Sequence, residues 1–76
     1  MSEEIQRFIE KGTSLLQDSK YEEALQCFES ALVLDPKNTS LWNKKGIALR
    51  SLGRYDEAIE CFNRSLEIEP TDLDAS

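Results

Sequence analysis

The fold is decided by a stretch of sequence that occurs twice. Residues 8–36 read FIEKGTSLLQDSKYEEALQCFESALVLDP, and residues 42–70 read WNKKGIALRSLGRYDEAIECFNRSLEIEP. The two stretches align without a gap at a spacing of 42 − 8 = 34 residues. A period in this range indicates one supersecondary unit used twice, each copy burying its apolar face against its neighbour. The identical pairs are Lys11/Lys45, Gly12/Gly46, Leu15/Leu49, Tyr21/Tyr55, Glu23/Glu57, Ala24/Ala58, Cys27/Cys61, Phe28/Phe62, Leu32/Leu66 and Pro36/Pro70.

Each copy contains two segments whose apolar residues recur at helical spacing. We expect helices over about residues 3–18 and 21–34 in the first copy, and about 39–52 and 55–68 in the second. No segment shows the alternation of a strand. The loops between the segments are short, so successive helices must pack antiparallel. The pattern therefore predicts an all-α chain of two tandem helical hairpins.

The helix ends carry their own local signals. Pro36 and Pro70 end the second and fourth helices, because the residue before a proline is pushed out of the helical conformation. Asn38 is a good N-cap for the third helix. Gly53 is placed to end that helix in a left-handed conformation.

Two glycines interrupt the first helix of each copy at the same place. A glycine inside a helix costs about 1 kcal/mol relative to alanine, and this chain accepts that cost at both Gly12 and Gly46. We expect the gain to be a close approach between the paired helices. Ala24 and Ala58 are expected to be the small residues opposite.

Composition excludes several kinds of site. The chain has 76 residues, no histidine, two cysteines and a net charge of −6. A zinc site of the Cys/His type and a histidine-dependent triad are therefore out of reach. Cys27 and Cys61 occupy equivalent positions on separate helices, too far apart for a disulfide, and are expected to be small buried side chains in a reducing compartment.

The same composition bears on location and partners. Negative charge argues against a nucleic-acid partner, whose phosphates require basic side chains. The chain starts with acidic residues, unlike a signal peptide, and has no apolar run of membrane length. We expect a cytoplasmic protein without a membrane partner and without a cofactor. Its carboxylates are expected on outward helix faces, where they favour solubility over catalysis, so an enzyme is not predicted.

The repeated residues resemble a known family. Phe8, Lys11, Gly12, Leu15, Ala24, Phe28 and Pro36, with their counterparts 34 residues later, resemble the tetratricopeptide repeat. The resemblance implies a single repeat domain over residues 1–76, an α-solenoid segment of four helices. Its first repeat would span residues 5–38 and its second residues 39–72. Residues 73–76 would begin a truncated third unit or a cap.

The resemblance also implies a function. In this family the first helix of each repeat lines a concave groove that binds a peptide or a partner helix, so we expect a protein-interaction scaffold. The residues carried over onto the groove are Gln6, Ile9, Thr13, Asn43, Lys44, Ile47 and Arg50. Basic residues are concentrated between residues 39 and 54, whereas seven acidic residues and one arginine follow from Tyr55 onward. A positive strip in the groove would orient an acidic peptide.

The fourth helix allows another interpretation. If no helix covers it, part of its apolar face, namely Ile59, Phe62 and Leu66, is left exposed, and exposed patches of this kind invite association. The alternative to peptide binding is therefore a structural unit that self-assembles through this face. An engineered or excised repeat with no ligand would show the same internal similarity.

Overall fold

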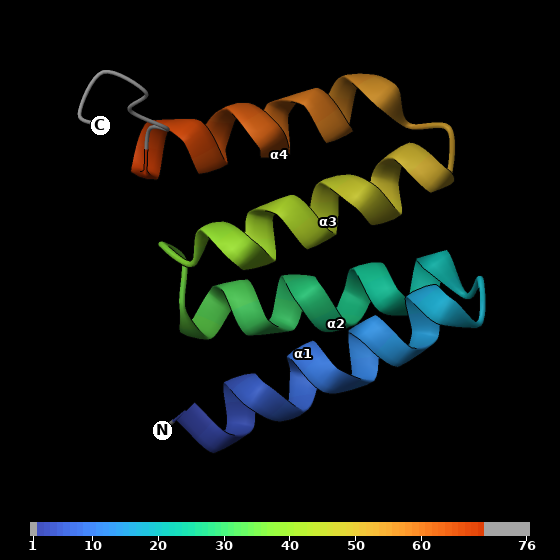
Figure 1. Cartoon of the computed structure of the whole chain (residues 1–76), viewed down its shortest axis with the longest axis vertical. Coiled ribbons are helices and arrows are strands. Elements are labelled where there is room, and N and C mark those ends of the chain that lie inside the picture. Colours follow the sequence, from blue (N-terminus) through green and yellow to red (C-terminus); the bar gives the residue numbers. More distant parts are fainter. Residues whose placement is uncertain (1, 70–76) are drawn as a thin grey trace, which may run out of the picture.

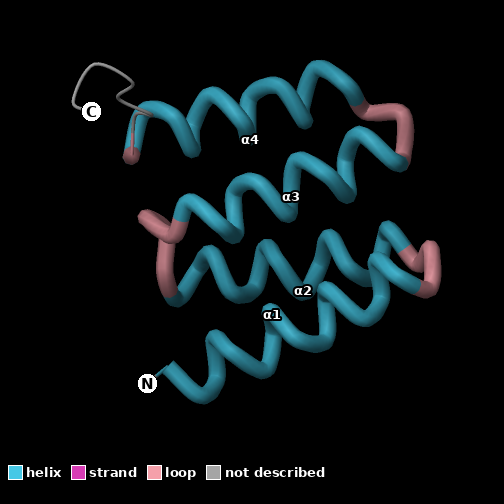
Figure 2. Tube along the Cα trace, in the orientation of Figure 1, coloured by secondary structure: helices cyan, strands magenta, loops and turns pink. Residues whose placement is uncertain are grey.

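The computed structural model describes residues 2–69, which form four helices and no strand. The helices are α1 (Ser2–Gln17), α2 (Tyr21–Leu34), α3 (Thr39–Ser51) and α4 (Tyr55–Ile68). Consecutive helices run antiparallel and lie side by side in chain order (Figure 1). The loops between them lie at the two ends of this row of helices (Figure 2). The predicted all-α arrangement of helical hairpins is confirmed.

The helix bounds follow the local signals closely. α2 and α4 have the bounds expected from the sequence, residue for residue. α1 begins and ends one residue earlier than expected, and α3 ends at Ser51, one residue early. The Asn38 side chain accepts a hydrogen bond from the Leu41 backbone N–H at 3.2 Å, which confirms Asn38 as the N-cap of α3. The third unit expected at residues 73–76 lies outside the described residues.

α1 and α3 end in the same way although their end residues differ. Gly53 has the expected positive φ, 82°, and the Arg54 N–H behind it donates to the Leu49 carbonyl at 2.9 Å. After α1 this conformation is held by Ser19, with φ 63°. The Lys20 N–H then donates to the carbonyl of Leu15 at 2.8 Å. This hydrogen-bond pattern satisfies the last carbonyls of a helix and reverses the chain within two residues.

The two hairpins form an open stack. Within residues 2–69, α4 contacts α3 and no other helix, whereas α3 also packs on α2 and touches α1. The two halves are therefore not folded back on each other as a closed bundle. They stand side by side in one orientation, with the leading helices α1 and α3 in contact.

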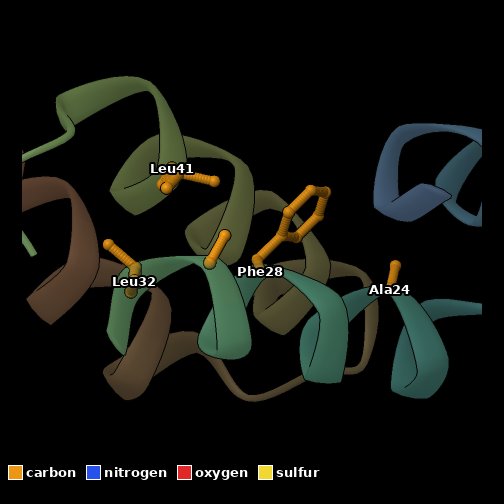
Figure 3. Close-up of a cluster of buried hydrophobic side chains, with 5 residues drawn as sticks. Ala24, Phe28, Leu32 and Leu41 are labelled. Carbon is orange, nitrogen blue, oxygen red and sulfur yellow. The ribbon is translucent and has the colours of Figure 1, made fainter. Parts of the chain in front are cut away.

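The hydrophobic core runs through both hairpins. One cluster consists of Ala24, Phe28, Ala31 and Leu32 on α2 together with Leu41 on α3, and Figure 3 shows Leu41 and Phe28 approaching each other from their two helices. A second cluster joins α2, α3 and α4. Trp42 and Leu16 are partly buried and pack against both clusters, so neither repeat has a separate core. The second cluster consists of Leu25, Ala48, Leu49, Ala58 and Cys61.

The helix glycines do create a close approach, but the residue opposite is not the expected one. A Cβ atom added to Gly12 would lie 2.5 Å from a ring carbon of Phe28, and one added to Gly46 would lie 2.7 Å from Phe62. The expectation that Ala24 and Ala58 stand opposite the glycines is therefore wrong. The phenylalanine one turn further along fills the space, because its ring reaches back over the preceding turn of its helix.

The two cysteines behave as expected. Cys27 and Cys61 are both buried and both are free thiols. Each packs as a small apolar side chain in the interior of its own hairpin.

Candidate functional site

The seven residues expected in the groove lie on α1 and α3. Gln6, Ile9 and Thr13 recur at i, i+3 and i+7, which places them on one face of α1. On α3, Asn43, Ile47 and Arg50 share one face in the same way. α1 and α3 contact each other, so both faces belong to the leading helices of the stack. We call this set the groove face, and it consists of Gln6, Ile9, Thr13, Asn43, Lys44, Ile47 and Arg50.

The residues of the groove face differ in how accessible they are. Gln6, Asn43 and Arg50 are exposed, whereas Thr13 and Lys44 are half-buried. Ile9 is half-buried because it packs against the first core cluster, so part of its surface already belongs to the fold. Ile47, by contrast, leaves 37% of its surface exposed. The groove face is thus mostly polar, with one accessible aliphatic side chain.

The positive strip is narrower than the sequence suggested. Lys45 points away from the groove face and pairs with Glu29 on α2, with 3.7 Å between Nζ and the carboxylate. Arg54 forms two hydrogen bonds with Glu57, at 2.6 and 2.8 Å. These hydrogen bonds hold the pKa of the Glu57 carboxyl below its ordinary value. Of the basic residues between 39 and 54, only Lys44 and Arg50 belong to the groove face.

The structure also contains a pair of equivalent hollows that the sequence analysis missed. We call them the outer slots, because α3 contributes to the second slot with the face opposite its groove residues. The first slot, of about 250 Å³, lies between α1 and α2, and the second, of about 270 Å³, is lined by α2, α3 and α4. Every residue of the first has its counterpart 34 residues later in the second. The first is lined by Phe8, Lys11, Leu15, Glu23, Gln26, Cys27 and Ser30; the second by Trp42, Lys45, Leu49, Glu57, Glu60, Cys61 and Arg64, with Glu29 in addition.

Trp42 is the centre of the second slot. The Lys45 ammonium and the Arg64 guanidinium lie 5.3 and 5.7 Å from the centre of its ring, within range of cation–π attraction. Its indole N–H donates to the Pro36 carbonyl at 2.8 Å, which ties the ring to the loop between the repeats. The cations of the slot are thus already engaged with Trp42. Repetition of Phe8 as Trp42 and of Lys11 as Lys45 is the sequence signal that could have revealed this cluster.

Beneath this slot lies the Cys61 thiol. Burial raises the pKa of Cys61 above its ordinary value of 9.0, although the nearby Lys45 ammonium partly offsets the rise. A thiol with a raised pKa forms little of the thiolate that nucleophilic chemistry needs. Cys61 is therefore a packing residue.

The outward face of α4 is apolar and uncovered. Its equivalent on α2 is covered by α3, and the comparison is direct because the positions repeat. Leu25 is 5% exposed and Ile59 is 54% exposed, and the corresponding values for Leu32 and Leu66 are 7% and 51%. Phe62 is half-buried. We call Ile59, Phe62 and Leu66 the α4 patch.

The family comparison agrees with this geometry. A family model described as tetratricopeptide repeat matches residues 12–76. The chain belongs to the tetratricopeptide-repeat family. A comparison with curated proteins found no match. Tetratricopeptide repeats generally mediate interactions between proteins and are scaffolds without catalytic residues of their own. None of the helices within residues 2–69 is both long and apolar enough to cross a membrane.

Proposed function

We propose that this tetratricopeptide-repeat chain binds a peptide or a partner helix along the groove face. The observation that carries the proposal is the open stack of two hairpins in one orientation, which sets the leading helices α1 and α3 against each other. Side chains from two repeats then line one surface, and a ligand can contact both repeats at once. Such surfaces are how repeat proteins recognise extended partners.

The chemistry of the groove face favours an acidic peptide with an apolar anchor. Lys44 and Arg50 supply positive charge, and α3 carries no acidic residue to cancel it. Ile47 lies between them in the sequence and on the same face, and it offers an exposed aliphatic contact. Gln6 and Asn43 supply amide groups that can bond to a peptide backbone. Charge would set the orientation and the rate of binding, while Ile47 would contribute most of the affinity.

A displayed library of random peptides tests the proposal. The full chain is used for selection, and the enriched peptides are then titrated against variants. Ile47→Asp is expected to weaken binding by about tenfold or more, because it places a carboxylate where an apolar anchor docks. Val33→Asp is the matched control, since Val33 is 81% exposed and lies on α2, outside the groove face.

A second variant separates charge from apolar contact. The double change of Lys44 and Arg50 to alanine is expected to reduce both the affinity and its dependence on salt, since fewer charges are screened. Enriched peptides are expected to carry Asp or Glu beside an aliphatic residue. Peptides that bind Ile47→Asp and the double variant as tightly as the unchanged chain would show that the groove face is not the binding surface.

A further inference from the structure

The repeat supplies an internal template for what covers the α4 patch. Leu25, Phe28 and Leu32 on α2 are the 34-residue equivalents of Ile59, Phe62 and Leu66. In the structure these α2 residues are buried, and the helix that covers them is α3. The kind of helix that fits the α4 patch can therefore be inferred from the properties of α3.

α3 binds α2 through a small set of residues. Leu41 and Ala48, seven positions apart, are fully buried, and they belong to the clusters that contain the apolar side chains of α2. Lys45 lies between them on the same face and reaches Glu29 of α2 at 3.7 Å. An apolar residue, a lysine four positions later and a small apolar residue three positions after that form the docking pattern.

The interface between α2 and α3 joins an acidic helix to a basic one. α2 carries Glu22, Glu23 and Glu29 and no basic residue. α3 carries Lys44, Lys45 and Arg50 and no acidic residue. Opposite charges therefore flank the apolar seam, which selects the partner and its direction more than it adds affinity.

α4 repeats the acidic character of α2. Asp56, Glu60 and Glu67 flank the α4 patch along one side, as 100° steps around the helix place them, and all three are exposed. Glu57 adds a fourth carboxylate, and Arg64 is the only basic residue of the helix. Asn63 stands where α2 has Glu29, so the particular ion pair with Lys45 is not repeated, but the acidic border is.

A second copy of this chain fits the α4 patch poorly. α1 is the helix that would stack on α4 in a head-to-tail array, and there Arg7 and Ser14 replace the buried Leu41 and Ala48 of α3. Such stacking would bury a guanidinium against apolar side chains. Pairing of α4 with α4 would bring two acidic borders together, between molecules that each carry a net charge of −6.

We infer that the α4 patch docks a basic amphipathic helix from a partner protein. The helix carries an aliphatic residue, a lysine or arginine four positions later, and a small apolar residue three positions after that, as α3 does. Apolar contact with Ile59, Phe62 and Leu66 supplies the affinity. The acidic border of Asp56, Glu60 and Glu67 selects helices with basic flanks. This surface shares no residue with the groove face, so the two proposals stand or fall separately.

The test uses α3 itself as the probe. A peptide of residues 38–52 is held helical by a hydrocarbon staple joining positions 43 and 47, which lie opposite the docking pattern. It is titrated into the isotopically labelled full chain and followed by nuclear magnetic resonance. The amide signals of residues 59–66 are expected to shift with saturation. A control peptide with Lys44→Glu, Lys45→Glu and Arg50→Glu is expected to bind about tenfold more weakly or worse.

Variants of the chain locate the binding. Ile59→Asp is expected to abolish the shifts while leaving the helix content unchanged, because this side chain is more than half exposed. Val33→Asp, an equally simple change outside the patch, is expected to leave them intact. Absence of any shift with a peptide shown to be helical would overturn the inference. Equal binding of the charge-reversed peptide, shifts confined to the groove face, or concentration-dependent pairing of the chain with itself through α4 would overturn it as well.

Discussion

The closest contacts in the molecule predict opposite outcomes for two equivalent substitutions. Replacing a glycine in a helix interior with alanine gains about 1 kcal/mol of helix propensity. At Gly12 the new Cβ would lie 2.5, 2.8 and 3.0 Å from three ring atoms of Phe28. At Gly46 the corresponding distances to Phe62 are 2.7, 2.8 and 3.1 Å. Either ring has to move before the methyl group fits.

The two rings differ in their freedom to move. Phe28 is fully buried between its own hairpin and α3, so moving it disturbs the first core cluster. Overpacking a well-packed core typically costs about 1–3 kcal/mol, which exceeds the gain in propensity. Gly12→Ala is therefore expected to lower the free energy of unfolding by about 1 kcal/mol, or about 4–8 °C in Tm for a domain of this size.

Gly46→Ala is expected to be neutral or stabilising, by up to about 1 kcal/mol. Phe62 is half-buried, and no helix within the described residues covers its outer edge, so the ring can turn away. Urea denaturation followed by circular dichroism measures both variants. In a Phe28→Leu background the cost of Gly12→Ala is expected to disappear, which a double-mutant cycle would report as coupling. A Gly12→Ala variant as stable as the unchanged chain, or a Gly46→Ala variant that is the less stable of the two, would refute this reasoning.

Two further predictions use the same comparison of equivalent positions and the one buried thiol with a shifted pKa. Leu32→Ala is expected to cost about 2–5 kcal/mol of stability because it opens a cavity in the core, whereas Leu66→Ala is expected to cost less than about 1 kcal/mol because that side chain is half exposed. Equal losses in thermal or urea unfolding would mean that something covers α4 in solution. Because the pKa of Cys61 is raised in the folded state, its thiol ionises first in the unfolded chain, so the stability it contributes is present below pH 9.0 and is lost as pH rises through the folded pKa. Urea midpoints measured from about pH 7 to pH 10 are expected to fall more steeply for the unchanged chain than for Cys61→Ala, and parallel curves would contradict this.

Much of the fold could be predicted because its determinants are local. The N-cap at Asn38, the positive φ of Gly53 and the prolines after α2 and α4 act within a few residues of themselves, and the helix bounds follow from them. Ser19 adopts the same left-handed conformation as Gly53 without glycine's freedom to do so. That conformation could not be predicted from its side chain, because the hairpin contacts on either side impose it.

The candidate sites depended more on tertiary structure. The sequence assigned Gln6, Asn43, Ile47 and Arg50 to the faces of their helices, and whether these faces bind a peptide remains a prediction. It could not tell that Lys45 turns toward Glu29 and Trp42, because a count of charges along a helix carries no information about direction.

The sequence by itself determined that the chain is built of two equivalent helical hairpins, and where each helix begins and ends. Only the tertiary structure decided which equivalent positions are covered: Leu32 is buried while Leu66 is half exposed, and Phe28 is enclosed while Phe62 is not. The physical reason is that capping and turn formation involve neighbours in the chain, whereas burial depends on what packs against a face. A repeated pattern is identical at both positions, but α3 covers only one of them.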